Sequence, residues 1–181
     1  PNPLDHWSDP FLQVAHQTYN MNTFTAFVQD TYRILPNLRL HFGFKSILAT
    51  SRVGNGTIDS SYYGAGSTIA SGVGLTTAKA FLPHISIDWN FLKHHELFFD
   101  VSENAHAFPM SGYNMSASPF AISQTAFDQG RKSFHPETDW TYALGYRYSS
   151  SLLSASVYAY RTNFYNRLQQ VTSGSAINPI S

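Results

Sequence analysis

The chain has 181 residues, of which 12% are charged and 15% aromatic, and its formal net charge is zero. This charged fraction is about half that of an ordinary soluble domain. Without excess positive charge or a basic patch, the chain lacks the lysines and arginines with which a nucleic-acid binder neutralises phosphates. Cysteine is absent, which excludes disulfides and thiolate metal sites.

The apolar residues are interleaved with polar ones, a pattern that favours strands over helices. No segment approaches the ~18 consecutive apolar residues of a membrane-spanning helix. Passage through a membrane would therefore need a closed barrel, because that is the other architecture that satisfies the backbone hydrogen bonds in lipid.

The first expected strand covers residues 22–35, after an irregular loop over residues 1–19. Its two sides are not cleanly separated, because Asp30 shares a side with Phe24. Pro36-Asn37 then predicts a short turn, since proline presets a turn angle and asparagine tolerates unusual ones.

The clearest alternation lies in residues 38–45, where one side is apolar and the other is polar or glycine. Successive side chains of a strand point to opposite faces, so a slip of one residue would exchange the two sets. The apolar side carries Leu38, Leu40, Phe42 and Phe44, and the other side carries Arg39, His41, Gly43 and Lys45.

Residues 51–77 are rich in Gly, Ser, Thr and Tyr and predict a long loop, a feature that is often functional. Strands are expected over residues 83–92 and 96–104, joined by a polar turn at Lys93-His94-His95. In the first of them, the Asp88 side chain points to one side of the strand and those of Ile87 and Trp89 point to the other.

Residues 105–137 form a second long connection. Within it, Ser118, Pro119 and Gly130 occupy the N-cap, first-turn and C-terminal positions of a short predicted helix.

Residues 140–171 predict a hairpin around a serine turn at 149–151. One side of its first strand carries Tyr142, Leu144, Tyr146 and Tyr148, and the other carries Thr141, Ala143, Gly145 and Arg147.

These segments predict an all-β fold, an antiparallel meander of about six long strands with short turns at one end and long loops at the other. That arrangement, with one apolar and one polar side, is typical of a transmembrane β-barrel. We expect the apolar side to meet lipid through Leu40, Phe42, Ile87, Trp89, Leu144 and Tyr146. We expect the lumen to be lined by Arg39, His41, Lys45, Asp88 and Arg147.

Several sequence patterns coincide with the predicted strands. FVQDTY at residues 27–32 is followed by LRL at 38–40 and GFK at 43–45, and PET at 136–138 leads to YALGYR at 142–147, SVY at 156–158 and NFYN at 163–166. These patterns resemble strand pairs of TonB-dependent outer-membrane receptors. With residues 83–90 and 97–102, the resemblance covers most of residues 22–170. Ala143 stands where that family usually has glutamate.

The resemblance implies that residues 1–181 are an internal part of a barrel of about twenty-two strands. No signal sequence, TonB box, plug domain or terminal aromatic strand is recognised. The implied function is that of a receptor in the bacterial outer membrane that takes up a scarce small-molecule ligand. That ligand would be a ferric siderophore, in iron uptake, or alternatively a carbohydrate or cobalamin.

The implied partners are outer-membrane lipid, the plug domain and the remaining barrel strands. The inner-membrane TonB complex would supply the energy through the absent N-terminal part.

The aromatic and histidine residues of the two long connections are candidates for ligand contact, because aromatic surfaces with polar tips suit siderophore or sugar faces. The alternative is that some of them belong to an aromatic girdle at the membrane interface. The candidates are Tyr62, Tyr63, His106, Phe108, Tyr113, Phe134 and His135.

No enzyme, metal site or cofactor is predicted. His94-His95 and the pair His135 and Glu137 match no zinc-binding spacing, and the sequence contains no nucleophile elbow, complete phosphate loop or zinc-protease motif.

Two alternative functions stay open. The first is a passive porin or structural barrel, in which case the whole protein would have no plug domain and no TonB box. A soluble β-sandwich binding module would require the apolar sides of the strands to pack on each other.

Overall fold

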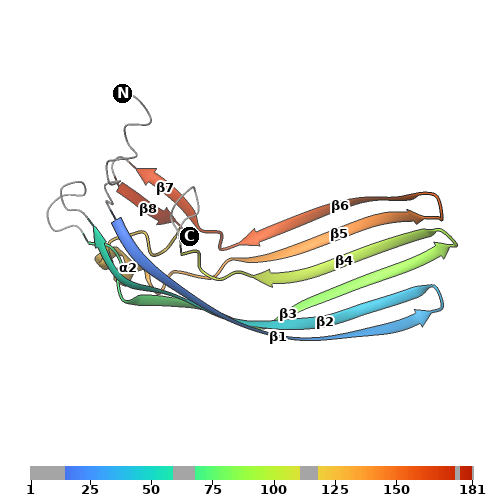
Figure 1. Ribbon diagram of the computed structural model, residues 1–181, viewed down its shortest axis with the longest axis horizontal. Helices are drawn as coiled ribbons and strands as arrows, with labels where there is room; N and C mark the ends of the chain where they lie inside the picture. The colour runs from blue at the N-terminus through green and yellow to red at the C-terminus, as the bar shows by residue number, and fades with distance from the viewer. Residues whose placement is uncertain (1–14, 59–67, 111–117, 174–175, 181) are drawn as a thin grey trace, which may run out of the picture.

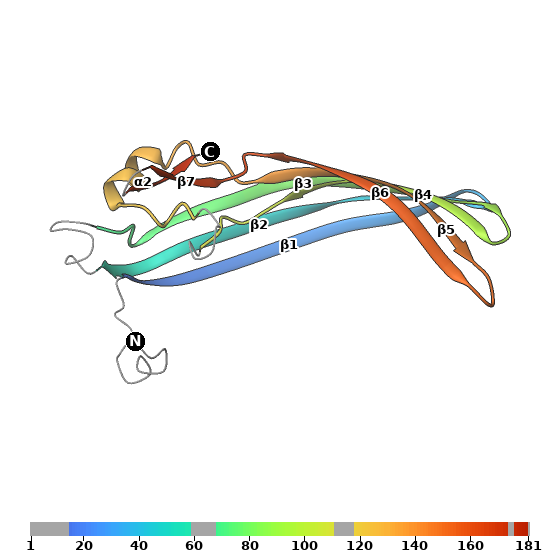
Figure 2. The same cartoon turned by 90° about the horizontal axis from the view of Figure 1, so that it is seen from above.

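The structure is a computed structural model that describes residues 15–58, 68–110, 118–173 and 176–180. Six strands form one antiparallel sheet in chain order, and a short helix and a separate strand pair lie at one end of it (Figures 1 and 2). The strands of the large sheet are β1 (Ala15–Leu35), β2 (Leu38–Ile58), β3 (Val73–Leu92), β4 (His95–Ala105), β5 (Thr138–Ser149) and β6 (Ser154–Tyr165). The predicted six-stranded meander is therefore confirmed. The second sheet pairs β7 (Gln169–Ser173) with β8 (Ala176–Ile180) and was not predicted.

The three short turns lie together at one end of the sheet, as the sequence predicts (Figure 1). Pro36-Asn37 joins β1 to β2, and the Asn37 side-chain amide donates to the carbonyl of Asn90 at 3.1 Å, which ties this turn to β3. The two long connections leave from the opposite ends of the strands, so both emerge at the same end of the sheet.

The first three strands are longer than predicted. They have 20 or 21 residues, whereas β4, β5 and β6 have 11 or 12. The predicted loop over residues 51–77 is wrong at both ends, because residues 51–58 belong to β2 and residues 73–77 belong to β3. The predicted loop over residues 1–19 is likewise wrong for residues 15–19, which begin β1.

The physical reason is that small residues do the packing in these extensions. Ser51 and Thr77 are fully buried, and Val53 is only 2% exposed. A strand whose covered face consists of small side chains lacks the large apolar residues by which alternation is usually recognised.

Cross-strand register divides the sheet into two faces, because residues directly opposite one another point to the same side. Leu40 pairs with Ile87, Ile87 with Phe99, and Phe99 with Leu144. We call this side the apolar face, and it carries Leu40, Phe42, Ile87, Trp89, Leu144 and Tyr146. The opposite side, the polar face, carries Arg39, His41, Lys45, Asp88 and Arg147.

Within the described residues, no second sheet covers the apolar face. Leu144 is 59% exposed there, and Val157, which pairs with Tyr146, is 66% exposed. A soluble β-sandwich would instead pack such an apolar face against a second sheet. This face also carries charged side chains: Asp30 lies opposite Phe42, Glu103 opposite Trp140 and Arg161 opposite Tyr142.

The apolar face carries aromatic pairs at both ends. Trp89 and Phe91 lie near the short turns with ring centroids 5.6 Å apart, and Trp140 and Tyr142 stack near the other end at 6.4 Å. Aromatic girdles at two levels are typical of barrels that cross a bilayer.

The connection between β4 and β5 contains one helix, α2 (Gln124–Gly130). Its N-cap is Ser123, whose hydroxyl accepts from the Ala126 amide at 3.2 Å, so the predicted start at Ser118 is wrong by five residues. Ser118 is used differently: its hydroxyl bonds to the carbonyls of Pro109 and Met110. In the described part of the chain, no helix has both the length and the apolarity needed to cross a membrane.

A compact apolar core lies beside the long ends of β2 and β3, away from the short turns. We call it the loop cluster, and it joins strand residues to residues of both long connections. Phe120 and Phe127 are fully buried in it, with ring centroids 5.7 Å apart. Its buried members are Val53, Ala70, Leu75, Phe108, Phe120, Ile122 and Phe127.

Candidate functional site on the polar face

Near the short turns, the polar face carries an ion-pair group that joins three strands. The carboxylate of Glu96 in β4 accepts from the guanidinium of Arg147 in β5 and lies 4.0 Å from that of Arg39 in β2. The Glu96 side chain is 14% exposed, whereas the two arginines are about half exposed. Asp88 lies directly opposite Arg39 in register, so the two arginines are matched by two carboxylates in this part of the face.

A second group lies next to it across β1, β2 and β3. The imidazole Nε2 of His41 lies 3.0 Å from the Asp88 carboxylate, and its Nδ1 lies 2.8 Å from the hydroxyl of Thr31. The three side chains fix the orientation of the imidazole, since a ring nitrogen that donates to Asp88 leaves the other to accept from Thr31.

A third group connects the sheet to the long connection that follows β4. Lys45 donates to the side-chain oxygen Oδ1 of Asn104 at 2.8 Å, and the side-chain Nδ2 of Asn104 donates to the Asp139 carboxylate at 3.0 Å. Asp139 also accepts from His106 at 2.8 Å and from Thr141 at 3.3 Å. Asp139 is 5% exposed, so its charge is held among three donors instead of by water.

The polar face is hollowed between the second and third groups. A depression of about 310 Å³ is lined by Lys45, His84, Asp100, Ser102, Asn104 and residues of β1 and β2. Basic, acidic and amide groups converge in it, which suits a polar partner or ordered water better than an apolar ligand.

The long connections fold over this same face and are anchored to it. Buried hydroxyls of the strands donate to the backbone of the second connection, Ser51 to the Phe108 carbonyl at 2.9 Å and Thr77 to the His106 carbonyl at 3.0 Å. The two connections also bond to each other, because the Ala70 amide donates to the Ile122 carbonyl at 2.9 Å. The loop cluster is therefore an ordered structure above the polar face.

The predicted ligand-contact residues fall into three groups. Tyr62, Tyr63 and Tyr113 lie outside the described residues. Phe108 is 3% exposed and Phe134 packs against the same cluster, so both serve packing in this structure.

His106 and His135 are exposed candidates. The His106 side chain is 53% exposed while it bonds to Asp139, and the His135 ring nitrogen Nδ1 lies 2.8 Å from the Ser133 carbonyl. Of the predicted set, these two histidines are the described side chains that present polar atoms to the surroundings.

In the described ranges, no cluster of three or more His, Cys, Asp or Glu side chains has a metal-binding arrangement.

A comparison with protein-family models matches residues 1–180 to the family described as TonB dependent receptor-like, beta-barrel. The chain belongs to the TonB-dependent receptor family. Comparisons with curated proteins and with solved structures gave no match. As in other TonB-dependent receptors, the barrel of this family is an outer-membrane structure, and the open six-stranded sheet is part of a larger barrel. The family consists of transporters and receptors, not enzymes.

In this TonB-dependent receptor segment, three residues of the polar face were not predicted from the sequence: Glu96, Asn104 and Asp139. A signal for Glu96 and Asn104 was present, because both lie at even positions of β4 with Asp100 and Ser102, away from the apolar side. Asp139 follows the PET pattern directly, but two of its three donors, Asn104 and His106, come from another strand and a loop, which alternation within one strand does not reveal.

Proposed function

We propose that the protein imports a scarce small molecule across the outer membrane, with the external loops binding the ligand and the TonB complex supplying energy through a plug domain. The polar face then lines the lumen, where Arg39, His41, Lys45, Asp88 and Arg147 meet water and plug groups. The apolar face meets lipid.

The observation that supports this proposal most is the asymmetry of the single sheet. One face exposes large apolar side chains, and the other carries three charged groups beneath an ordered loop cluster. In lipid, exposed apolar side chains carry no penalty, and charges facing a wet lumen remain solvated. A membership in the TonB-dependent receptor family is consistent with both properties.

The ligand class proposed is a ferric siderophore or a similar molecule, with carbohydrate or cobalamin as further members of the set. His106 and His135 are the proposed contacts among the described residues, because both are exposed at the loop end of the barrel. Imidazole groups suit a polar ligand that presents hydroxyl or carboxylate oxygens.

The experiment uses the whole receptor in cells. Iron-labelled hydroxamate and catecholate siderophores, labelled cobalamin and labelled maltooligosaccharides are offered to cells with and without a functional TonB complex. We expect one probe to bind in both strains and to accumulate only when TonB functions. Equal accumulation in both strains would instead indicate a passive porin.

The contribution of the loop histidines is tested in the same cells. His106→Ala and His135→Ala should weaken binding of the accumulated probe, while His94→Ala serves as the matched control because His94 lies in the turn at the opposite end. Unchanged binding in both loop variants would remove these histidines from the ligand site.

A further inference from the structure

The apolar face changes its chemistry abruptly along β1, β2 and β3. Two residues beyond the last apolar side chain of each strand, the same face becomes polar. The apolar members are Phe24, Leu48 and Ala78, and they are followed by Asn22, Thr50 and Thr76. Because the register keeps all six on one side, this line marks the level at which the outward face leaves the hydrocarbon.

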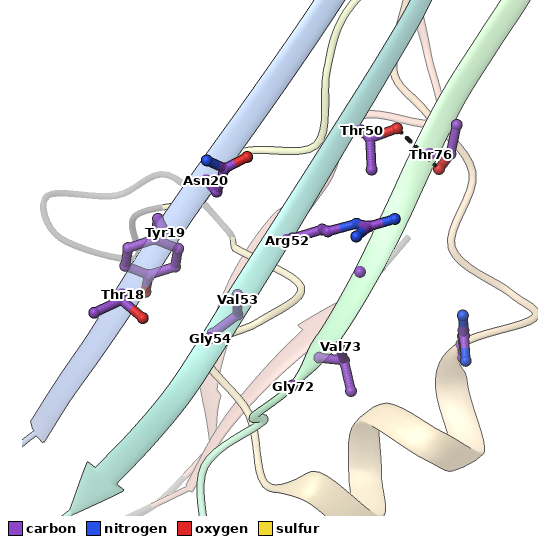
Figure 3. A pocket seen from close by; sticks show the side chains of 12 residues that line it. Thr18, Tyr19, Asn20, Thr50, Arg52, Val53, Gly54, Gly72, Val73 and Thr76 are labelled. Atoms are coloured by element: carbon purple, nitrogen blue, oxygen red, sulfur yellow. Dashed lines mark hydrogen bonds between the residues drawn. The ribbon is translucent and has the colours of Figure 1, made fainter.

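A groove of about 520 Å³ begins at this line on the outward side (Figure 3). Thr50 and Thr76 form its lower edge, with hydroxyl oxygens 3.5 Å apart across β2 and β3. Tyr19 also lines the groove, but it is in register with Val53, and its phenol donates to the Gln17 side chain at 2.5 Å on the side of the loop cluster. The further lining residues are Thr18, Asn20, Arg52, Val53, Gly54, Gly72, Val73, Gly74 and Arg131.

Arg52 lies across the floor of the groove, and its side chain extends from β2 over β3 (Figure 3). Gly74 makes room for it: a Cβ at Gly74 would lie 2.9 Å from the Cγ of Arg52. The pair faces each other in register, so the missing side chain on β3 lets the guanidinium lie in the groove.

A second guanidinium reaches the groove from the loop cluster. The pairing of β3 with β4 begins at His84, so the upper part of β3 has β2 on one side only. Arg131, the C-cap residue of α2, lines the groove from that open edge. Two arginines from separate elements therefore face one polar groove.

The groove has the chemistry of a site for phosphate and sugar. Its described lining contains two guanidiniums, three threonine hydroxyls and one asparagine amide, and no carboxylate. Arginine binds phosphate through two parallel N–H donors, and hydroxyl and amide groups match the oxygens of a sugar. Most of its lining, including Asn20, Arg52 and Gly74, lies on the apolar side of the sheet, away from the polar face that carries the charged groups.

The position of the groove along the strands indicates that the phosphate and sugar would belong to a lipid headgroup. Thr50 and Arg52 lie two and four residues beyond Leu48, which is about 7 to 14 Å along the strand. In a barrel whose strands are tilted by about 35–45°, this length rises roughly 5 to 11 Å along the bilayer normal. Headgroups occupy roughly the first 5 to 8 Å beyond the hydrocarbon on each side of a bilayer, and larger sugar headgroups reach further. We propose that this groove binds the phosphate-bearing sugar headgroup of an outer-leaflet glycolipid, with Arg52 and Arg131 as the phosphate ligands. This site is separate from the proposed import function and needs only the outer-membrane location.

The experiment uses the full receptor purified in detergent and measured by native mass spectrometry. The probes are diphosphorylated lipid A, dephosphorylated lipid A and inorganic phosphate. We expect the receptor to retain diphosphorylated lipid A, and the double variant Arg52→Gln with Arg131→Gln to bind it on the order of tenfold or more weakly, because two charge-assisted contacts are lost. Lys132→Gln is the matched control, since Lys132 follows Arg131 but does not line the groove.

A second variant keeps both arginines. Thr50→Glu places a carboxylate at the lower edge of the groove and should reduce lipid A binding in the same way, with heat-modifiable gel migration confirming that the barrel assembles. Equal retention of lipid A by the double variant and by Lys132→Gln would overturn the proposal. Equal binding of the dephosphorylated lipid, or binding of phosphate without lipid A, would overturn it as well.

Discussion

The ring of Phe98 in β4 occupies the space that a side chain on Gly145 of β5 would need. The two residues face each other in register on the polar face, and a Cβ at Gly145 would collide with the ring. The Arg147 guanidinium lies 5.2 Å from the centroid of the same ring. An aromatic ring from one strand thus covers a glycine of the next, an arrangement that fixes register between strands.

We expect Gly145→Ala to destabilise the barrel by about 1 to 3 kcal/mol, because the Phe98 ring must leave its position to admit a methyl group. The measurement is the free energy of unfolding of the full receptor in phospholipid vesicles by denaturant titration. In a Phe98→Ala background the same substitution should cost less, and the remaining cost comes from the Cβ of Tyr158, 2.8 Å from the added methyl group. Equal costs in both backgrounds would show that the ring does not set the penalty.

Charge placement on neighbouring positions of β5 tests the two faces. Leu144→Arg should cost about 2 to 4 kcal/mol near the bilayer midplane, because the guanidinium would enter lipid. Ala143→Arg is the matched control, since Ala143 lies on the polar face opposite Asp100. The measurement is the folding free energy in vesicles together with heat-modifiable migration. Similar costs at both positions would contradict the assignment of the faces.

The third prediction concerns the attachment of the loop to the sheet. Asp139→Ala leaves His106, Asn104 and Thr141 without their shared acceptor, so residues 106–110 should exchange backbone hydrogens faster. Glu103→Gln is the control, because Glu103 adjoins Asn104 but points to the other side of β4. Hydrogen exchange with mass spectrometry measures the effect. Unchanged protection in Asp139→Ala would show that other contacts hold the loop.

The fourth prediction separates the loop cluster from the barrel. Phe127→Ala removes a fully buried ring that contacts Phe120 and Phe134, and such truncations cost about 3 to 5 kcal/mol. We expect faster hydrogen exchange in residues 68–72 and 118–134, with β5 and β6 unaffected. Loss of protection throughout the sheet would instead mean that cluster and barrel unfold as one unit.

Alternation predicted the strands whose two faces differ in size and polarity. In residues 38–45, Arg39 and Leu40 belong to chemically different sets, so the register and the polar face followed from the sequence. The turn positions followed as well, because Pro36 and Asn37 have backbone preferences that are independent of tertiary contacts.

Alternation did not predict the structure where strand residues are small, or where contacts distant in sequence determine the role of a residue. Gly74 lay within the predicted loop over residues 51–77, but in the structure it is a strand residue that leaves room for the Arg52 side chain of β2. Ser118 and Ser123 are equally suitable caps by residue type, but the Ser118 hydroxyl accepts from the Phe120 amide in a turn that precedes the helix, and Ser123 is the cap. Phe108 was a candidate for ligand contact because local sequence does not show that Phe120 and Phe127 lie in the same core.

The loop cluster has a consequence for how the protein is built. Its core unites Val53 and Leu75 of two strands with Phe120 and Phe127 of a later connection, so it forms only after a long stretch of chain has been brought together. It also lies beyond the apolar band, at the end of the sheet from which both long connections leave. We therefore expect that, when the barrel is inserted into a bilayer, the connecting segments cross it before their phenylalanines are buried, so that this core forms in water on the far side.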